Sequence, residues 1–104
     1  MFNAASLKAV YSARASTHLV RPLYDSYCFA NLPASIAYLL TGEGQHTLPA
    51  DVFAGLPTRF DRIVLFFIDA FGWRFFERYA SKYSSLKTFT QQGIVSKLTS
   101  QSRA

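Results

Sequence analysis

The feature that most constrains this chain is an unbroken apolar run that ends at a carboxylate. Residues 63–68 read IVLFFI, Asp69 follows directly, and Gly72 comes three residues later. An apolar run without alternation is typical of a strand buried on both faces, as in parallel α/β sheets. Asp69 is then expected at the carboxyl end of this strand, where open α/β sheets place their ligand sites, with Gly72 allowing a tight turn after it.

The residues after this run predict two short helices and a second strand. Apolar residues spaced three and four apart predict a helix from about Trp73 to Lys82, and Gly93 ends a second helix that begins near Ser84. Residues 94–99 read IVSKLT and predict a strand with one partly solvated face. Because the connection is long enough for a parallel crossover, we expect an α/β fold with a right-handed βαβ unit, its strands at about 62–68 and 94–99.

The first sixty residues carry weaker local signals. Residues 1–20 are expected to form a flexible N-terminus, in which helical spacing extends over a single turn. Pro33 suits the first turn of a helix and Gly42 suits a left-handed cap at its end, so a short helix is predicted between them. Residues 41–57 are rich in Gly and Pro and predict a surface connection, with one helical turn at 51–54.

Composition indicates more apolar material than so short a chain can enclose. Half of the 104 residues are hydrophobic, and 16% are aromatic. A domain of this size buries only somewhat over 60% of its unfolded surface. The sequence therefore predicts either association through an exposed apolar surface or membership in a larger protein.

Charge and cysteine content limit the function classes. The net charge is +5, but the basic residues are scattered, so no nucleic-acid partner is expected. Cys28 is the one cysteine, which rules out an internal disulfide and predicts a buried apolar filler in a cytoplasmic protein. No apolar run approaches the roughly 18 residues of a membrane helix.

Two interpretations of Asp69 stay open on these grounds. A carboxylate beside a buried strand needs solvent, hydrogen bonds or a cation, and Asp oxygens suit Zn²⁺, Mg²⁺ or Mn²⁺. An Asp that follows a core strand also commonly forms a turn or caps the next helix. The first interpretation predicts a metal ligand, and the second predicts a structural role.

A resemblance bears on this choice. Residues 61–72, DRIVLFFIDAFG, resemble the opening strand and metal loop of the alkaline phosphatase superfamily, most closely its type I phosphodiesterase and nucleotide pyrophosphatase branch. Residues 73–79 and 93–101 look like the helix and strand that follow, and residues 21–24 and 27–33 look like an N-terminal extension found in some members. Ala70 stands where the family commonly has Gly.

The resemblance implies a partial alkaline-phosphatase-like fold over residues 21–104 that stops before the loop of the nucleophile. In the family, two divalent metal ions, typically zinc, activate a Thr or Ser hydroxyl against a phosphodiester or nucleotide-like substrate. Asp69 takes the place of one metal ligand. Ser102 lies outside any matching motif, and so do His18 and His46, so none of them inherits a site role.

The sequence therefore predicts the N-terminal part of a metal-dependent phosphodiesterase that is inactive alone, holding at most one partial metal site. The alternative is a small non-catalytic α/β interaction module, or half of a split enzyme. In either case the exposed apolar surface is the predicted contact with a partner.

Overall fold

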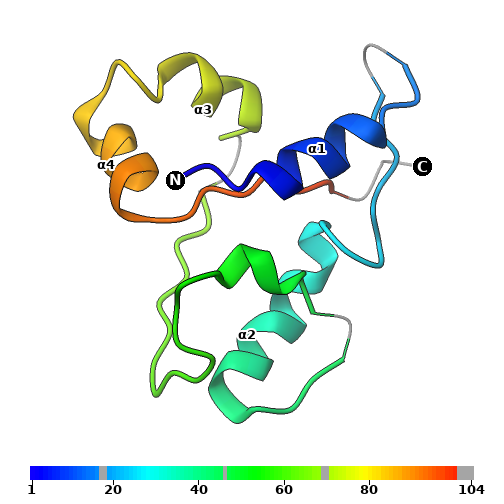
Figure 1. Ribbon diagram of the computed structural model, residues 1–104, viewed down its shortest axis with the longest axis vertical. Helices are drawn as coiled ribbons and strands as arrows, with labels where there is room; N and C mark the ends of the chain where they lie inside the picture. The colour runs from blue at the N-terminus through cyan, green and yellow to red at the C-terminus, as the bar shows by residue number, and fades with distance from the viewer. Residues whose placement is uncertain (17–18, 46, 69–70, 101–104) are drawn as a thin grey trace.

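The computed structural model describes residues 1–16, 19–45, 47–68 and 71–100, and its regular structure is helical. In these ranges the longest helix has ten residues, and no helix is long and apolar enough to cross a bilayer. Figure 1 shows three of the α-helices in one half of the molecule and α2 in the other. The α-helices are α1 (Ala4–Ser12), α2 (Leu32–Thr41), α3 (Trp73–Tyr79) and α4 (Ser84–Gln92), and the 3₁₀ helices are η1 (Phe29–Asn31) and η2 (Ala50–Phe53).

Local signals account for the ends of several helices. Pro33 lies in the first turn of α2, and Gly42 ends it in the left-handed conformation with φ 81°, as the sequence predicts. The Gly42 N–H donates to Tyr38 O at 2.7 Å. The side chain of Asn3 caps α1 by accepting a hydrogen bond from the Ser6 N–H. The predicted turn at 51–54 is confirmed as η2, and α3 is three residues shorter than predicted.

Residues 94–99 run through the middle of the molecule in extended form and join its two halves (Figure 1). Val95 forms a parallel bridge with Phe2, and Thr99 forms another with Cys28. The Asn3 N–H donates to Val95 O at 2.7 Å, and the Thr99 N–H donates to Tyr27 O at 2.8 Å. The segment thus pairs with residues near 2 and near 28, and these bridges stay isolated instead of forming a sheet in the described ranges.

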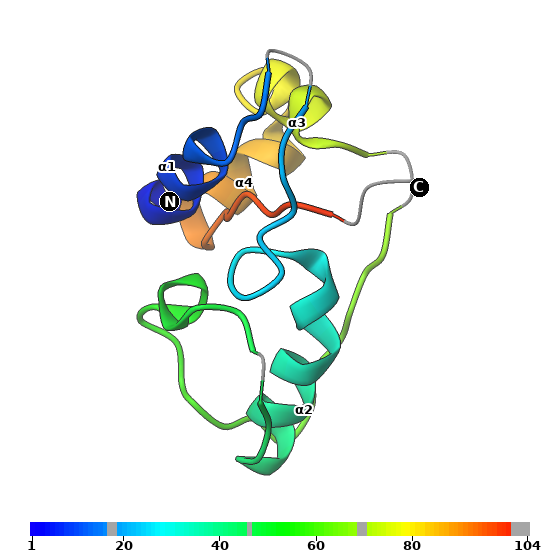
Figure 2. The same ribbon diagram turned by 90° about the vertical axis from the view of Figure 1, so that its right-hand side faces the viewer.

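The predicted α/β fold and βαβ unit are therefore wrong. Residues 62–68 follow an extended course (Figure 2), but they form no strand, and within the described chain none of them makes a backbone hydrogen bond to another segment. Figure 2 shows this stretch along the edge of the molecule, between α2 and the start of α3. Val64, Phe66 and Ile68 are 76%, 83% and 67% exposed, so the run that predicts a doubly covered strand lies in solvent.

The physical reason lies in the pairing of residues 94–99. A buried parallel strand needs a hydrogen-bonded neighbour and cover on both faces. The segment expected to be that neighbour is engaged by Phe2 and Cys28 instead. Among the described contacts of residues 62–68 is the one between the rings of Phe67 and Phe29, whose centroids are 5.6 Å apart.

The molecule exposes much of its apolar material. Its accessible surface is 8041 Å², whereas a folded monomer of its mass, 11.7 kDa, exposes about 5,900 Å². All ten Phe residues lie in the described ranges, and none of them is buried. The buried apolar residues of these ranges are few: Val10, Tyr27, Cys28, Leu39, Leu48 and Ala80.

A polar cluster, here called the Asp51 junction, ties four remote segments together. It consists of Asn3, Tyr27, Asp51 and Ser96. One carboxylate oxygen of Asp51 accepts hydrogen bonds from the Tyr27 hydroxyl at 2.7 Å and from the Asn3 amide at 2.8 Å. The same amide donates to Ser96 Oγ at 2.9 Å. These bonds span 24, 48 and 93 residues of sequence, so the junction links the chain's beginning, middle and end.

The junction shifts the pKa values of its two ionisable members in opposite directions. Burial, the hydrogen bond to Asp51 and its negative charge raise the pKa of Tyr27 to about 12. Burial also disfavours the charged form of Asp51, but the hydrogen bonds from Tyr27 and Asn3 outweigh it and lower the pKa of that carboxyl. The stable pair is thus a neutral phenol that donates to an ionised carboxylate.

This pair predicts an alkaline dependence of stability. The ordinary pKa of Tyr is 10, and that of Tyr27 in the folded chain is about 12. Between these two pH values the folded chain keeps a proton that the unfolded chain releases. The stability contributed by Tyr27 is therefore full below pH 10 and falls as the pH rises through this window. Tyr27→Phe should cost about 1–3 kcal/mol at pH 8 and remove this loss. Urea unfolding from pH 8 to 12 measures both effects. Tyr24→Phe, at an exposed tyrosine, is the control, and an unchanged pH slope in Tyr27→Phe contradicts the assignment.

The exposure of the apolar run predicts an unusual tolerance to charge. Phe66→Lys should change the free energy of unfolding by no more than about 0.5 kcal/mol, because the side chain already faces water. Leu39→Lys, at a buried position of α2, should cost several kcal/mol or prevent folding. Urea denaturation of both variants is the measurement. Similar destabilisation by both would show that the run is packed.

Candidate functional site

Asp69, the predicted metal ligand, lies outside the described residues together with Ala70. The same holds for His18, His46 and Ser102. The prediction that Asp69 binds a metal therefore stays a prediction. The described residues before and after this gap differ in their side-chain contacts. Ile68 is exposed, whereas the ring of Phe71 packs against Phe75 with centroids 4.9 Å apart.

Gly72 does not form the tight turn that the sequence predicts. Its φ of −84° and ψ of 172° are those of extended backbone, which any residue adopts. A Cβ built on Gly72 meets no atom within 4 Å. Gly72 itself is therefore extended where α3 begins, and no feature described at Gly72 requires glycine.

The described residues do not supply a metal centre of their own. Across residues 1–16, 19–45, 47–68 and 71–100, no three side chains among His, Cys, Asp and Glu come together as a ligand group. A zinc site draws three or four ligands from the protein. The two-metal site that the resemblance implies thus does not fit these ranges alone, and we derive no catalytic step through it.

Cys28 has the structural role that its aromatic neighbours predict. It is fully buried and unoxidised, and its backbone pairs with Thr99. The side chain therefore fills space beside the central extended segment.

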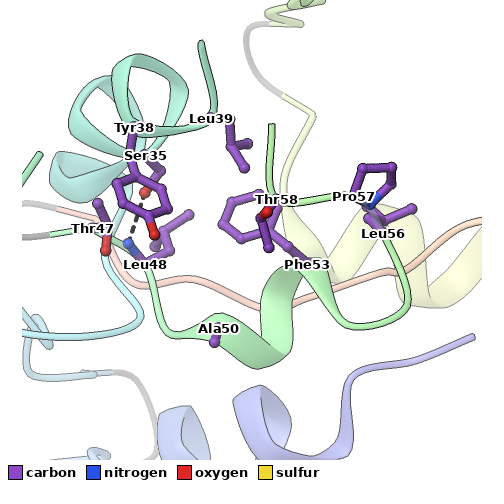
Figure 3. A pocket seen from close by; sticks show the side chains of 10 residues that line it. All are labelled: Ser35, Tyr38, Leu39, Thr47, Leu48, Ala50, Phe53, Leu56, Pro57 and Thr58. Atoms are coloured by element: carbon purple, nitrogen blue, oxygen red, sulfur yellow. Dashed lines mark hydrogen bonds between the residues drawn. The ribbon is translucent and has the colours of Figure 1, made fainter. Parts of the chain in front are cut away.

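One pocket, here called the α2 pocket, lies beside α2 and has a volume of about 240 Å³ (Figure 3). Helix α2 forms one side of it, and η2 with the loop after it forms the other. The described residues of its wall carry no carboxylate, ammonium or guanidinium group, so they offer no acid–base pair for hydrolysis. These residues are Ser35, Tyr38, Leu39, Thr47, Leu48, Ala50, Phe53, Leu56, Pro57 and Thr58.

Ser35 is the one buried hydroxyl in that wall, and its hydrogen bonds are structural. Its Oγ donates to Asn31 O at 2.7 Å and accepts from the Leu48 N–H at 2.7 Å (Figure 3). A nucleophilic serine needs a base that accepts its proton, whereas Ser35 gives its proton to a backbone carbonyl. It therefore fixes the 47–48 loop to α2.

A second pocket, here called the α1–α3 pocket, has a volume of about 490 Å³ and differs in charge. Three cationic side chains and one carboxylate are among the described residues that line it. The indole N–H of Trp73 donates to Glu77 Oε2 at 2.8 Å, and Lys97 Nζ lies 5.4 Å from the centroid of the Trp73 ring. The lining consists of Val10, Tyr11, Arg14, Val20, Gly72, Trp73, Arg74, Glu77 and Lys97.

Sequence reasoning did not anticipate this gathering of cations. Arg14, Arg74 and Lys97 are dispersed along the chain, and no local pattern connects them. They share one pocket because residues 94–99 cross the molecule beside α1, where the Lys97 N–H donates to Ser6 Oγ at 2.9 Å. Only the long-range pairing could have indicated the pocket.

Comparison with protein-family models, with curated proteins and with solved structures finds no match to this chain.

The role assigned to Ser35 predicts a specific loss of stability. Ser35→Ala leaves the buried Leu48 N–H without its acceptor and should cost about 1–3 kcal/mol of unfolding free energy. Thr88→Ala is the control, because its hydroxyl donates to Ser84 O on the exposed surface of α4, and it should cost less than about 1 kcal/mol. Urea unfolding compares the two, and equal costs would refute the structural role of Ser35.

Proposed function

We propose that this chain is the N-terminal part of a metal-dependent phosphodiesterase of the alkaline phosphatase superfamily, and that Asp69 provides one ligand of its metal site. The motif resemblance around Asp69 is the basis of the assignment. One observation supports the proposal that the chain is a part of a larger enzyme. The run at 63–68 is extended, apolar and exposed, and it has no backbone partners in the described chain. A segment of this kind gains stability when another surface covers it.

The remaining part of the enzyme is the proposed partner of this run. Covering it removes apolar side chains from water immediately before Asp69, and so fixes the position of the carboxylate. One carboxylate does not hold two metal ions, so the other ligands and the nucleophile come from that remaining part. The substrate class that accompanies the resemblance is a phosphodiester or a nucleotide-like molecule.

The chain alone should therefore be inactive. With Zn²⁺ and bis(4-nitrophenyl) phosphate we expect no turnover above that of Zn²⁺ without protein, measured by release of nitrophenolate. Robust turnover that Asp69→Asn abolishes would overturn the claim that the chain is only part of the site.

The family assignment is tested by extending the chain with the codons that follow Ala104 in its source genome. We expect them to encode a Pro-Ser-Thr-Thr-like loop and later Asp and His motifs. In that extended protein, Asp69→Asn should lower kcat/KM by about a hundredfold or more, because even the loss of a group that only hydrogen-bonds to a metal ligand costs about 10–100-fold. Asp61→Asn, at an exposed carboxylate of the same segment, should leave it nearly unchanged. Downstream codons without these motifs would refute the assignment.

The second candidate is a non-catalytic interaction module, which the excess of accessible surface favours. A monodisperse monomer that unfolds cooperatively supports a module that folds independently. Aggregation or a molten state supports a part of a larger enzyme, because an uncovered apolar segment promotes association. Size-exclusion chromatography and urea unfolding distinguish the two.

A further inference from the structure

The α2 pocket has a described wall that is mostly apolar and carries no charged side chain. The most buried described members of this wall are Ser35, Leu39 and Leu48. The rings of Tyr38 and Phe53 project from α2 and from η2 on opposite sides of the hollow (Figure 3). Sites for small molecules commonly combine an apolar and aromatic wall with a few polar groups. The wall therefore has the composition of a small-molecule site.

The segment that closes this pocket is fastened to α2 at both of its ends. The Leu48 N–H donates to Ser35 Oγ at 2.7 Å, and the Phe60 N–H donates to Leu39 O at 2.8 Å. Between these two bonds lie η2 and the loop after it, which form the wall that faces α2. The shape of the pocket is thus set by the fold before any ligand binds, which lowers the cost of binding.

The volume of the pocket sets the size of its ligand. An apolar cavity of about 150 Å³ holds one benzene molecule. The α2 pocket has a volume of about 240 Å³, which gives room for a single ring with a small substituent. The rings of Tyr38 and Phe53 favour an aromatic ring in the ligand, because aromatic pairs attract one another beyond the gain from buried area.

The polar groups of the wall set the charge of the ligand. The hydroxyls of Tyr38, Thr47 and Thr58 make no hydrogen bond within the described chain, whereas that of Ser35 is already bonded twice. Because a hydroxyl both donates and accepts, these three groups suit an amide or hydroxyl substituent of the ligand. A charged ligand would meet no opposite charge in the described lining, and an unpaired charge that leaves water is costly.

We propose that the α2 pocket binds a small uncharged aromatic molecule that carries one hydrogen-bonding substituent. Aromatic amides, phenols and benzylic alcohols have this chemistry. The inference goes beyond the proposed phosphodiesterase function. It rests on residues other than Asp69 and on no metal ion, so it stands or falls separately from that function.

Three probes of nearly the same shape test the charge of the ligand: at neutral pH benzamide is uncharged, benzoate is an anion and benzamidine is a cation. In proton–nitrogen correlation spectra of the full chain, we expect benzamide to shift the amide signals of Leu48 and Thr58 in a saturable way, with a Kd of about 1 mM or lower. Benzoate and benzamidine should bind about tenfold more weakly or worse. No saturable shift with benzamide, or equally tight binding by either charged probe, overturns the proposal.

Cyclohexanecarboxamide tests the aromatic part of the proposal. It keeps the amide group and the ring size of benzamide but has no π system. It should bind about two- to tenfold more weakly than benzamide, because it loses the attraction to the rings of Tyr38 and Phe53. Equal or tighter binding would overturn the assignment to an aromatic ligand.

Matched substitutions test the location of the site. Tyr38→Ala and Phe53→Ala each remove one ring of the wall and should weaken benzamide binding by about tenfold. Tyr83→Ala and Phe89→Ala remove exposed rings that are outside the described lining. These two variants should change the Kd by less than about twofold, because distant sites act independently.

Circular dichroism verifies that each variant folds. Tyr38 is 40% exposed, so Tyr38→Ala keeps the test decisive even if Phe53→Ala disturbs η2. Equal weakening by Tyr38→Ala and Tyr83→Ala would show diffuse attraction to exposed aromatic rings and overturn the proposal.

Discussion

The carboxylate of Asp51 is the point at which the separate parts of this chain are held together. It accepts hydrogen bonds from Tyr27 and Asn3, and the amide of Asn3 extends the network to Ser96. The described chain has few buried apolar side chains and no sheet to provide the same cohesion. Hydrogen bonds to an ionised group are stronger than those between neutral groups, and they tolerate few geometries. The arrangement of helices therefore depends on a small polar network more than on a large core.

The same network accompanies a pairing of residues 94–99 that does not include the apolar run at 63–68. Asn3 and Tyr27 bring their own segments against residues 94–99, where the backbone groups of Val95 and Thr99 bond to residues near 2 and near 28 and not to the apolar run. The run is left at the edge of the molecule (Figure 2). Most of its side chains are exposed to water. An apolar segment that is extended but uncovered is the feature on which the proposed partnership with the rest of an enzyme is based. The α1–α3 pocket lies elsewhere on the molecule, and residues 63–68 are not part of its described lining.

Local chemistry in the sequence was enough to predict individual helices. Pro33 and Gly42 bound α2 because one fixes the backbone of the first turn and the other adopts the left-handed cap. Gly93 also marks the end of α4, but in extended backbone conformation, with φ −123°, and not as a left-handed cap. α1 was not predicted, because its apolar spacing extends over one turn and its cap, Asn3, is recognised only from the structure.

The errors arose where burial depends on distant residues. The run at 63–68 has the composition of a doubly covered strand, but composition does not reveal whether covering surfaces exist. The Asp51 junction and the α1–α3 pocket have no local signal in the sequence, because each brings together residues that are tens of positions apart. The candidate ligand Asp69 could be named only from its position after the run and from resemblance to a family motif.

The pairing of the first residues with residues 93–96 has a consequence for biosynthesis. The amino group of Met1 donates to Thr90 O and to Gly93 O, and Asn3 bonds to Val95 and Ser96. None of these contacts can form until at least residue 90 has been translated, which takes about 5–20 s at about 5–20 residues per second. During that interval the N-terminal segment has no docking site. Completion of this structure thus waits until residues 93–96 have been synthesised, and contacts of such long range fold slowly.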